Sequence, residues 1–339
     1  MRSSTLCCCA AWVFVVPGES VVPSSAKARP LVSQLLKLGG FDDRDWEFRR
    51  VLGGGNNFCN EVLEIQQAEA RFAVKIFSEV SKSRVPASER GFWDEAAGDA
   101  GLGPKVFARC PDAVLAAYVD GETLDENALF CDSHRVAQRL ADLHTLKVPA
   151  TDFCPLWRSV DAALDGASSD VTQRLFSLSL AELTSDAKRL RKTVEKNLGN
   201  PDVKFGHGDL KPSNVIRRSD DDLIFVDFEL AGSHYLAYDI GKLFRDRSDP
   251  DELTAFLRAY YDDKEDDALL LDRQRLAVDI FKPISWFEAA LFFLLMASKE
   301  EADDQWTTLA RDRYARYQAS LHLLDDAVAA LKETTSEKR

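Results

Sequence analysis

The chain has 339 residues, with 43 Lys or Arg against 56 Asp or Glu, so its formal net charge at pH 7 is −13. This acidic balance argues against a nucleic-acid partner, because binding to a phosphate backbone needs clustered Lys and Arg. The hydrophobic content of 45% is typical of a globular protein long enough for two lobes, and no run of twenty apolar residues predicts a membrane span. The sequence leaves the oligomeric state open.

The N-terminal residues differ in character from the rest of the chain. Arg2 precedes an apolar stretch at 6–16, and a run of small residues follows at 24–28. A positive end, a short apolar segment and small residues are the layout of a targeting signal, although three cysteines and a Trp are atypical of its core. We therefore expect residues 1–40 to be an extension outside the fold. The expected location is cytoplasmic, with an organelle or the secretory pathway as the alternative.

Residues 41–120 are expected to form a small lobe rich in strands. Alternating polarity predicts strands at 61–65 and 71–77, and a further apolar strand is expected at 114–119. A helix is expected at 88–100, where Gly-Leu-Gly-Pro then breaks the pattern.

The remaining residues, 121–332, are expected to form a larger helical lobe, followed by a polar tail at 333–339. A short buried strand is expected at 223–226. The spacing of apolar residues predicts helices at 136–144, 170–196, 284–297 and 309–331. The predicted fold class is therefore α+β, with a strand-rich N-terminal lobe and a helical C-terminal lobe.

One segment carries most of the chemical information. His207 and Asp209 are followed by Asn214, and Asp227 comes thirteen residues later at the end of a short strand. Phosphoryl transfer needs a carboxylate that orients a hydroxyl nucleophile, together with oxygen ligands for Mg²⁺. Asp209 suits the first role, while Asn214 and Asp227 suit the second. His207 is expected to hold the loop rather than to transfer protons.

The small lobe offers residues that would bind a nucleotide. Lys75 lies in a Phe-Ala-Val-Lys-Ile strand, the form in which a lysine reaches the phosphates of ATP. Glu89 is the expected partner of Lys75, and Glu95 is the alternative. A glycine-rich turn would offer backbone N–H groups to the phosphates, and the end of the last strand would line the adenine pocket. The candidate residues in these two places are Gly53, Gly54, Gly55, Asn57, Ala117 and Tyr118.

These segments resemble the choline/ethanolamine kinase family, within the aminoglycoside phosphotransferase and choline kinase superfamily of protein-kinase-like folds. The turn at 53–57 is similar to the family's G-G-x-T-N, and residues 101–104 match its G-L-G-P. The block at 227–244 is similar to D-F-E-Y…F-D-I-G-N-H-F, and residues 310–317 resemble its closing helix. The block at 227–244 is the most specific of these matches.

The resemblance implies a bilobal kinase-like fold that uses ATP and Mg²⁺. It implies that Asp209 is the catalytic base, that Asn214 and Asp227 are metal ligands, and that Asp239 braces the catalytic loop. The implied acceptor is a small alcohol that carries an ammonium group, choline or ethanolamine first, held by aromatic faces and carboxylates. The candidate residues for holding it are Glu229, Tyr235, Asp246 and Trp286. For Trp286, packing in the core is the favoured alternative, because an apolar helix supplies such residues in any case.

Three alternatives stay open. Leu230 stands where the family has Tyr after D-F-E, which favours another acceptor, such as one of the aminoglycoside or thiamine type. A catalytically silent binding module is a second alternative, although every expected type of active-site residue is present. A protein kinase is the third, but the D-F-G and A-P-E segments of that class are absent from the sequence.

Overall fold

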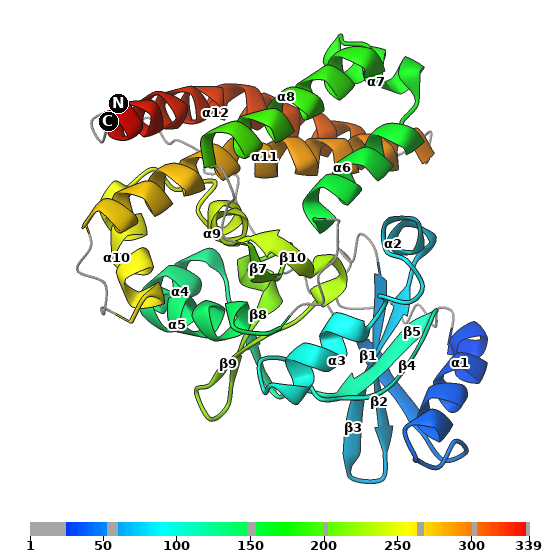
Figure 1. Ribbon diagram of the computed structural model, residues 1–339. Helices are drawn as coiled ribbons and strands as arrows, with labels where there is room; N and C mark the ends of the chain where they lie inside the picture. The colour runs from blue at the N-terminus through cyan, green and yellow to red at the C-terminus, as the bar shows by residue number, and fades with distance from the viewer. Residues whose placement is uncertain are drawn as a thin grey trace, which may run out of the picture.

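The computed structural model has a strand-rich lobe built from the N-terminal part of the chain and a larger helical lobe built from the rest (Figure 1). This arrangement confirms the expected α+β class, with a strand-rich N-terminal lobe and a helical C-terminal lobe. The structure describes residues 25–52, 60–147, 154–198, 203–262, 268–299 and 304–336.

A five-stranded antiparallel sheet forms the small lobe, with the strand order β1-β2-β3-β5-β4. Along β3, Phe72 and Val74 are buried on one face, whereas Lys75 belongs to the opposite face. The sheet therefore keeps Lys75 out of its own hydrophobic core. The strands are β1 (Glu47–Leu52), β2 (Asn60–Gln67), β3 (Ala70–Phe77), β4 (Val106–Cys110) and β5 (Ala113–Ala117).

Helix α1 (Ser25–Leu38) packs against this sheet, at the far end of the small lobe from the helical lobe (Figure 1). Its apolar residues at helical spacing, Val32, Leu35 and Leu36, are fully buried in one cluster with Trp46 and Phe72. The expected boundary at residue 41 was therefore too late, because the small lobe already includes α1. The targeting prediction for the first residues lies outside the described part of the chain.

Two short helices follow β3. Helix α2 (Glu79–Arg84) is capped by the Ser78 side chain, which accepts a hydrogen bond from the Ser81 N–H. Helix α3 (Phe92–Asp99) begins later than the predicted residue 88, because Gly91 adopts a φ of 71° just before it. Glu89 thus lies in the turn before α3 rather than on the helix.

Small strand pairs connect the two lobes and support the catalytic loop. Strand β6 (Gly121–Thr123) pairs with β8 (Val215–Arg218), which pairs with β9 (Leu223–Phe225). Strand β7 (Val203–Gly206) pairs with β10 (Gly232–Tyr235). Two 3₁₀ turns, Pro212–Asn214 and Phe228–Leu230, lie between these strands.

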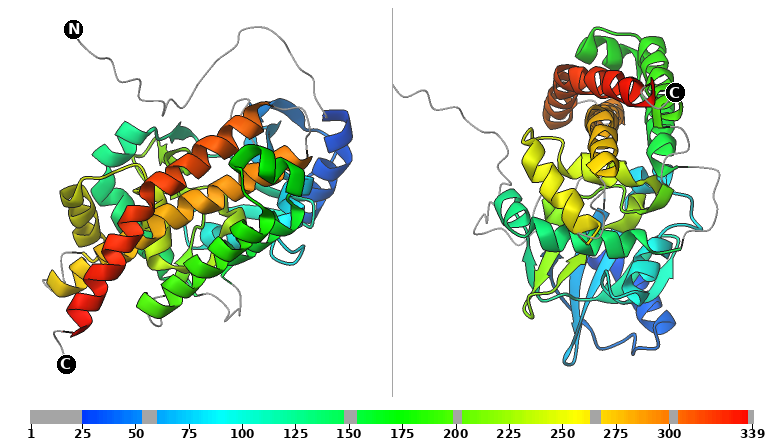
Figure 2. Two further views of the ribbon diagram at one scale, coloured as in Figure 1. Left: turned by 90° about the horizontal axis from the view of Figure 1, so that it is seen from above. Right: turned by 60° about the vertical axis from the view of Figure 1, so that its left-hand side comes forward.

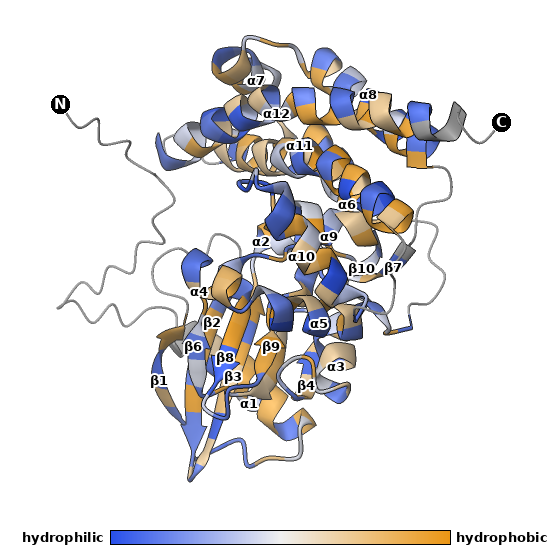
Figure 3. Ribbon diagram, turned by 90° about the vertical axis from the view of Figure 1, so that its left-hand side faces the viewer, coloured by the Kyte–Doolittle hydropathy of each residue, from blue (hydrophilic) through white to orange (hydrophobic). Residues whose placement is uncertain are grey.

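Helices make up the rest of the large lobe. The predicted helix at 170–196 is divided in two at Ser177, whose φ is 57°. The alternating colours of α8 and α12 in Figure 3 show that these outer helices are amphipathic. The helices are α4 (Glu126–Cys131), α5 (Ser133–His144), α6 (Pro155–Gly166), α7 (Ser169–Phe176), α8 (Leu180–Leu198), α9 (Leu236–Leu243), α10 (Pro250–Tyr260), α11 (Ala268–Lys299) and α12 (Asp304–Ser336).

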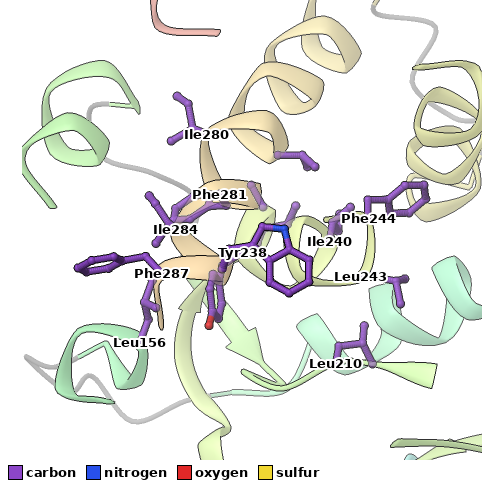
Figure 4. Packing of buried hydrophobic residues seen from close by; sticks show 14 of the residues in the cluster. Leu156, Leu210, Tyr238, Ile240, Leu243, Phe244, Ile280, Phe281, Ile284 and Phe287 are labelled. Atoms are coloured by element: carbon purple, nitrogen blue, oxygen red, sulfur yellow. The ribbon is translucent and has the colours of Figure 1, made fainter. Parts of the chain in front are cut away.

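Helix α11 (orange in Figure 2) forms the centre of this lobe, and α12 (red) lies against it. By length and composition α11 could cross a membrane, but 89% of its most apolar window is buried inside the lobe. Figure 4 shows Phe281 and Ile284 of α11 near Tyr238 and Ile240 of α9. We therefore interpret α11 as a core helix, which fixes the position of α9 behind the catalytic loop.

Candidate active site

A buried carboxylate holds the catalytic loop in place. The loop follows β7, and both carboxylate oxygens of Asp239 on α9 accept hydrogen bonds from its backbone. The N–H of His207 lies 2.6 Å from one oxygen, and the N–H of Gly208 lies 2.8 Å from the other. The geometry gives Asp239 the bracing role that the resemblance implied.

The loop also needs glycine at position 208. Gly208 has a φ of +77°, and a Cβ added there would lie 2.2 Å from the Leu230 carbonyl oxygen. Any other residue would be strained and would also displace the turn that follows Asp227. The close packing of these two turns keeps Asp209 and Asp227 in a fixed relation.

His144 of α5, which the sequence did not single out, supports Asp239 from behind. Its Nε2 lies 3.2 Å from the Asp239 carboxylate, and its Nδ1 lies 2.8 Å from the Tyr260 hydroxyl. Burial alone would raise the pKa of Asp239, but the hydrogen bond and charge of His144 lower it to about 2. In sequence, His144 was simply one position of an amphipathic stripe, and nothing local pointed to residues about a hundred positions away.

His207 is buried within the loop. Its Nε2 donates to the carbonyl oxygen of Val226 at 3.0 Å, and its Nδ1 accepts from the N–H of Asp209 at 3.3 Å. Burial lowers the pKa of His207, so the ring is neutral at pH 7. These contacts fit the expected loop-holding role and leave neither ring nitrogen for proton transfer.

Two lysines contact the Asp209 carboxylate. Lys211 Nζ lies 2.7 Å from one oxygen and Lys242 Nζ lies 2.9 Å from the other. Burial alone would raise the pKa of Asp209, but the two ammonium groups bring it well below its ordinary value. Asp209 is therefore ionised throughout the physiological pH range and can accept a hydrogen bond from a hydroxyl group. Neither Lys211 nor Lys242 was predicted to act in the site.

Lys75 links β3 to the second acidic residue of the site. Its Nζ lies 2.6 Å from Asp227 Oδ1 and 3.8 Å from Asp94 Oδ1. Burial alone would lower the pKa of Lys75, but Asp227, Asp94 and Glu229 together raise it above its ordinary value. Lys75 is therefore a buried cation between two lobes, as a phosphate-binding lysine requires.

The expected partner of Lys75 was wrong. Glu89 pairs with Arg158 of α6 at 2.8 Å, and the alternative, Glu95, pairs with Arg109 at 2.8 Å. Because α3 begins only at Phe92, its inward face presents Asp94 instead. Asp94 Oδ2 is buried with no hydrogen-bond partner, alone among the buried side-chain oxygens and nitrogens of the described residues. Asp94, rather than either glutamate, is thus the carboxylate of α3 that lies within 4 Å of Lys75 Nζ.

The residues predicted to bind Mg²⁺ belong to two neighbouring segments, because the N–H of Val226 donates to the Asn214 carbonyl at 3.0 Å. Asn214 donates through Nδ2 to the Asp209 carbonyl at 2.9 Å, which leaves its amide oxygen as a ligand. Asp227, one-third exposed, supplies a carboxylate. Within the described part of the chain, no three His, Cys, Asp or Glu residues cluster to bind a metal. One carboxylate and one amide oxygen fit Mg²⁺, which takes its other ligands from water and phosphates.

Only some of the remaining residues predicted to bind the nucleotide lie in the described part of the chain. Gly53, Gly54, Gly55 and Asn57 lie outside the described residues. The N–H of Ala117 donates to the Lys105 carbonyl at 2.8 Å, which leaves the Ala117 carbonyl at the start of the connection between lobes. The Tyr118 ring lies 3.7 Å beneath the Arg71 guanidinium, and its hydroxyl accepts from Arg50. The Tyr118 side chain therefore belongs to the sheet, so only its backbone stays a candidate for the nucleotide.

Two predicted substrate residues have other partners. Glu229 accepts hydrogen bonds from Asn60 at 2.6 Å and from Ser81, so it faces the small lobe. The Tyr235 hydroxyl accepts from Trp157 at 3.0 Å, and its ring stacks on Phe281 at 5.1 Å. Both side chains are therefore engaged in packing between elements rather than grouped around Asp209.

The other two predicted substrate residues are covered by arginines. The Asp246 carboxylate pairs with Arg316 at 2.7 Å. Trp286 is 3% exposed, and the guanidinium of Arg245 lies 4.0 Å from the centre of its ring. Trp286 is therefore packed in the lobe, and a guanidinium already lies over its ring, so the structure does not support it as a substrate residue.

Comparisons with known proteins identify the family of the chain. The sequence profile of the choline/ethanolamine kinase family matches residues 48–250. A probable ethanolamine kinase of Arabidopsis thaliana is 22% identical over 335 residues, covering 89% of each chain. An ethanolamine kinase of Drosophila melanogaster is 29% identical over 170 residues, which span 45% of this chain and 32% of that protein.

Solved structures show the same fold. A choline kinase of Cryptosporidium parvum superposes with a TM-score of 0.69 at 15% identity, covering 91% of this chain and 98% of that one. An ethanolamine kinase of Plasmodium vivax gives a TM-score of 0.67 at 18% identity, covering 82% and 83% of the two chains. The profile match, which spans more than half of the chain, confirms the resemblance seen in the sequence. The chain belongs to the choline/ethanolamine kinase family and is a small-molecule kinase.

Proposed function

We propose that this chain is a Mg²⁺- and ATP-dependent kinase that phosphorylates the hydroxyl of a small amino alcohol, with ethanolamine as the reference acceptor. One observation carries the proposal: the braced Asp209 carboxylate lies in the same site as Asn214, Asp227 and Lys75. This set is sufficient for phosphoryl transfer, in which the protein mainly positions groups and stabilises charge.

Each residue has a distinct task in this reaction. Asp209 accepts a hydrogen bond from the acceptor hydroxyl and aims its oxygen at the phosphorus atom. Lys75 and Lys211 place positive charge beside the phosphate oxygens, where negative charge is spread in the transition state. Asn214 and Asp227 would hold Mg²⁺, which neutralises phosphate charge when bound. Lys75 would then pair with Asp94, whose Oδ2 is buried and accepts no hydrogen bond from the described residues.

The surroundings favour a primary amine over a trimethylammonium group. A trimethylammonium group is recognised by several open aromatic faces. Here Trp286 lies under an arginine, and Tyr235 is stacked on Phe281. Ethanolamine therefore suits this site better than choline, in agreement with the names of several relatives.

A second candidate keeps the chemistry and changes the acceptor to one of the aminoglycoside or thiamine type. Leu230, buried beside the catalytic loop, replaces an aromatic residue of the family pattern. The loss of one ring removes contact area for a small cation and favours a different acceptor. A silent nucleotide-binding module is the remaining alternative.

An acceptor panel separates these functions. ADP release is measured with ethanolamine, choline, thiamine and kanamycin, each with Mg²⁺ and with EDTA. We expect metal-dependent ADP release with an amino alcohol and a lower kcat/KM for choline than for ethanolamine. ADP release only with thiamine or kanamycin would show that the acceptor is one of these molecules rather than a small amino alcohol. Binding of ATP and Mg²⁺ with no release for any small alcohol would contradict the proposal and favour the silent module.

A further inference from the structure

A buried lysine contacts the catalytic carboxylate from α9. Lys242 lies three residues after Asp239, and its side chain is only 4% exposed. Its Nζ lies 2.9 Å from Asp209 Oδ1, 3.1 Å from the Gly208 carbonyl oxygen and 3.4 Å from Glu288 Oε2. An ammonium group has three N–H donors, so these three oxygens match all of them. Lys242 is therefore fully engaged with the protein and has no donor left for a substrate.

The second lysine at this carboxylate is held less firmly. Lys211 Nζ lies 2.7 Å from Asp209 Oδ2, and its side chain is 41% exposed. Lys211 can therefore turn to a phosphate oxygen without leaving a buried charge unpaired, whereas Lys242 cannot leave its acceptors in this way. The two oxygens of Asp209 thus differ, because Oδ1 is bound to a fixed cation and Oδ2 to a movable one.

Glu288 of α11 holds Lys242 in place. The Glu288 side chain is 6% exposed, and its other oxygen, Oε1, accepts a hydrogen bond from Arg84 at 2.9 Å. Burial alone would lower the pKa of Lys242, but Asp209 and Glu288 raise it above its ordinary value, so the ammonium is charged at pH 7. Burying such charges is costly, and apolar side chains of similar size often stabilise a fold at least as well. A task in the site therefore explains this network better than stability does.

This lysine is also a departure from the family pattern. The pattern F-D-I-G-N-H-F has Asn at the position of Lys242, while Asp239 and Phe244 match it. Asparagine is neutral and shorter, so it cannot supply a positive charge to Asp209. The buried cation is thus a feature of this chain that the motif does not predict.

We propose that Lys242 is a positioning residue for phosphoryl transfer, which holds Oδ1 of Asp209 so that Oδ2 is presented to the acceptor hydroxyl. When the phosphates attract Lys211, Oδ2 becomes free, while Lys242 keeps the carboxylate in one orientation. Glu288 acts on Asp209 through Lys242, by fixing the ammonium. This inference rests on the proposed kinase activity and deepens it, and it leaves the class of acceptor unchanged.

The test removes the ammonium and separates turnover from binding. ADP release with ATP, Mg²⁺ and ethanolamine is measured for wild type and Lys242→Met. We expect kcat to fall roughly 10- to 100-fold, because a misplaced carboxylate orients the hydroxyl poorly, while the KM values for ATP and ethanolamine change less than about threefold. Lys242→Gln keeps a hydrogen-bond donor without the charge, so its loss of kcat should be smaller than that of Lys242→Met.

Lys282→Met is the matched control. The Lys282 side chain of α11 is 6% exposed, and its Nζ pairs with Asp279 at 2.8 Å and donates to the Arg247 carbonyl oxygen at 3.2 Å. The control thus removes a similar buried ammonium from the same lobe, and kcat should stay at the wild-type value. Thermal unfolding of each variant gives the folded fraction to which kcat is normalised. An equal loss of kcat in Lys282→Met and Lys242→Met would indicate a general packing defect and overturn the inference.

A double-mutant cycle tests the role of Glu288. Glu288→Gln alone should lower kcat less than Lys242→Met, because its amide oxygen still accepts a hydrogen bond from the ammonium. If Glu288 acts through Lys242, adding Glu288→Gln to Lys242→Met should lower kcat by less than about a further twofold. Losses that multiply would show that Glu288 acts independently, and would overturn the network.

The outcomes distinguish this inference from the proposed function. If wild type releases ADP and Lys242→Met has the same kcat, or only a raised KM, the inference is wrong and the proposed kinase activity stands. If Lys242→Met does not fold, Lys242→Gln decides in the same way, and a wild-type kcat in that variant overturns the inference.

A readout that does not need turnover completes the test. If wild type releases no ADP with any acceptor, the proposed function fails, and amide hydrogen exchange then tests the positioning. Exchange at residues 207–210 should be faster in Lys242→Met than in wild type and in Lys282→Met, because the loop loses the ammonium that binds Gly208 and Asp209. Equal exchange in the three proteins would overturn the inference.

Discussion

The two sides of the catalytic carboxylate differ in how closely they follow the general pattern of phosphoryl transfer. On the proposed nucleotide side, Lys75 pairs with Asp227 and Asn214 is hydrogen-bonded to the Asp209 carbonyl, so the residues that we propose for phosphate and Mg²⁺ are the ones that the motif predicted. On the acceptor side, Trp286 and Asp246 are bound to arginines. The chemistry of ATP is the same for every kinase, whereas the acceptor is not, so only the first side is fixed by the reaction.

This difference shows that a family match predicts the residues for ATP and metal better than the residues that bind the acceptor. Positions that hold ATP and metal can be transferred from a motif, because few residue types perform those tasks. Positions that hold the acceptor depend on which side chains meet from several helices, and a short motif does not encode this packing. The following four predictions test this contrast, starting with the largest effect.

Asp209→Ala should lower kcat by about 10²–10⁴-fold, because the acceptor hydroxyl loses its hydrogen-bond acceptor. Nucleotide affinity, measured by calorimetry with Mg²⁺, should change little. Asp325→Ala, at an exposed position of α12, is the matched control. Wild-type turnover in Asp209→Ala would show that another group does this work.

Asp239 should make the protein sensitive to acid. Its pKa is lowered from 3.8 to about 2 in the folded state, so its stabilisation is complete above the ordinary pKa and is lost as pH falls through the folded one. The free energy of unfolding is compared for wild type and Asp239→Asn by urea titration. The difference should shrink by about 1.5 kcal/mol from pH ~6 to pH ~2.5. A difference independent of pH would contradict the lowered pKa.

Asp94→Asn should reduce kcat/KM for ATP about fivefold, because Lys75 loses the carboxylate that holds it when metal binds Asp227. Glu95→Gln and Glu89→Gln, whose carboxylates pair with Arg109 and Arg158, are the matched controls and should change it less than about twofold. A larger effect for Glu89→Gln than for Asp94→Asn would restore the original prediction.

Asp246→Asn should have the smallest effect, below about twofold in kcat/KM for any acceptor. The Asp246 carboxylate is bound to Arg316 on the surface, and such ion pairs contribute about 0–1 kcal/mol. Steady-state assays with ethanolamine and L-serine measure it. A loss of more than about tenfold, specific to ethanolamine, would mean that Asp246 binds the ammonium group and that the acceptor side follows the family after all.

The sequence was sufficient for the fold class and for the order of the two lobes. Asp209, Asn214 and Asp227 share a short motif, and the two turns and the strand of that motif bring them together. The residues that act on them come from distant elements. His144 braces Asp239 from α5, and Lys242 contacts Asp209 from α9. The spacing of residues in the sequence does not predict these contacts, because they depend on how α5, α9 and α11 pack.

The clearest error comes from the predicted start of one helix. The partner of Lys75 was expected to be Glu89 or Glu95, whereas the start of α3 at Phe92 turns Asp94 inward. A helix rotates by 100° with each residue, so an error in its start changes which carboxylate faces the site. Trp286 is buried, as expected for packing in an apolar helix, but the arginines that cover its ring could not be predicted, because they follow α9 or lie on α12.

The buried ion pair between Arg84 and Glu288 has a consequence for motion. Arg84 ends α2 of the small lobe, Glu288 lies inside α11, and each side chain is 6% exposed. Removing one partner from such a pair costs about 3–5 kcal/mol, so separating the lobes at this point is expensive. We therefore expect the lobes to stay joined at α2 during any movement of one lobe relative to the other. Lys242 contacts both Glu288 and Asp209, so we expect it to move together with the catalytic loop.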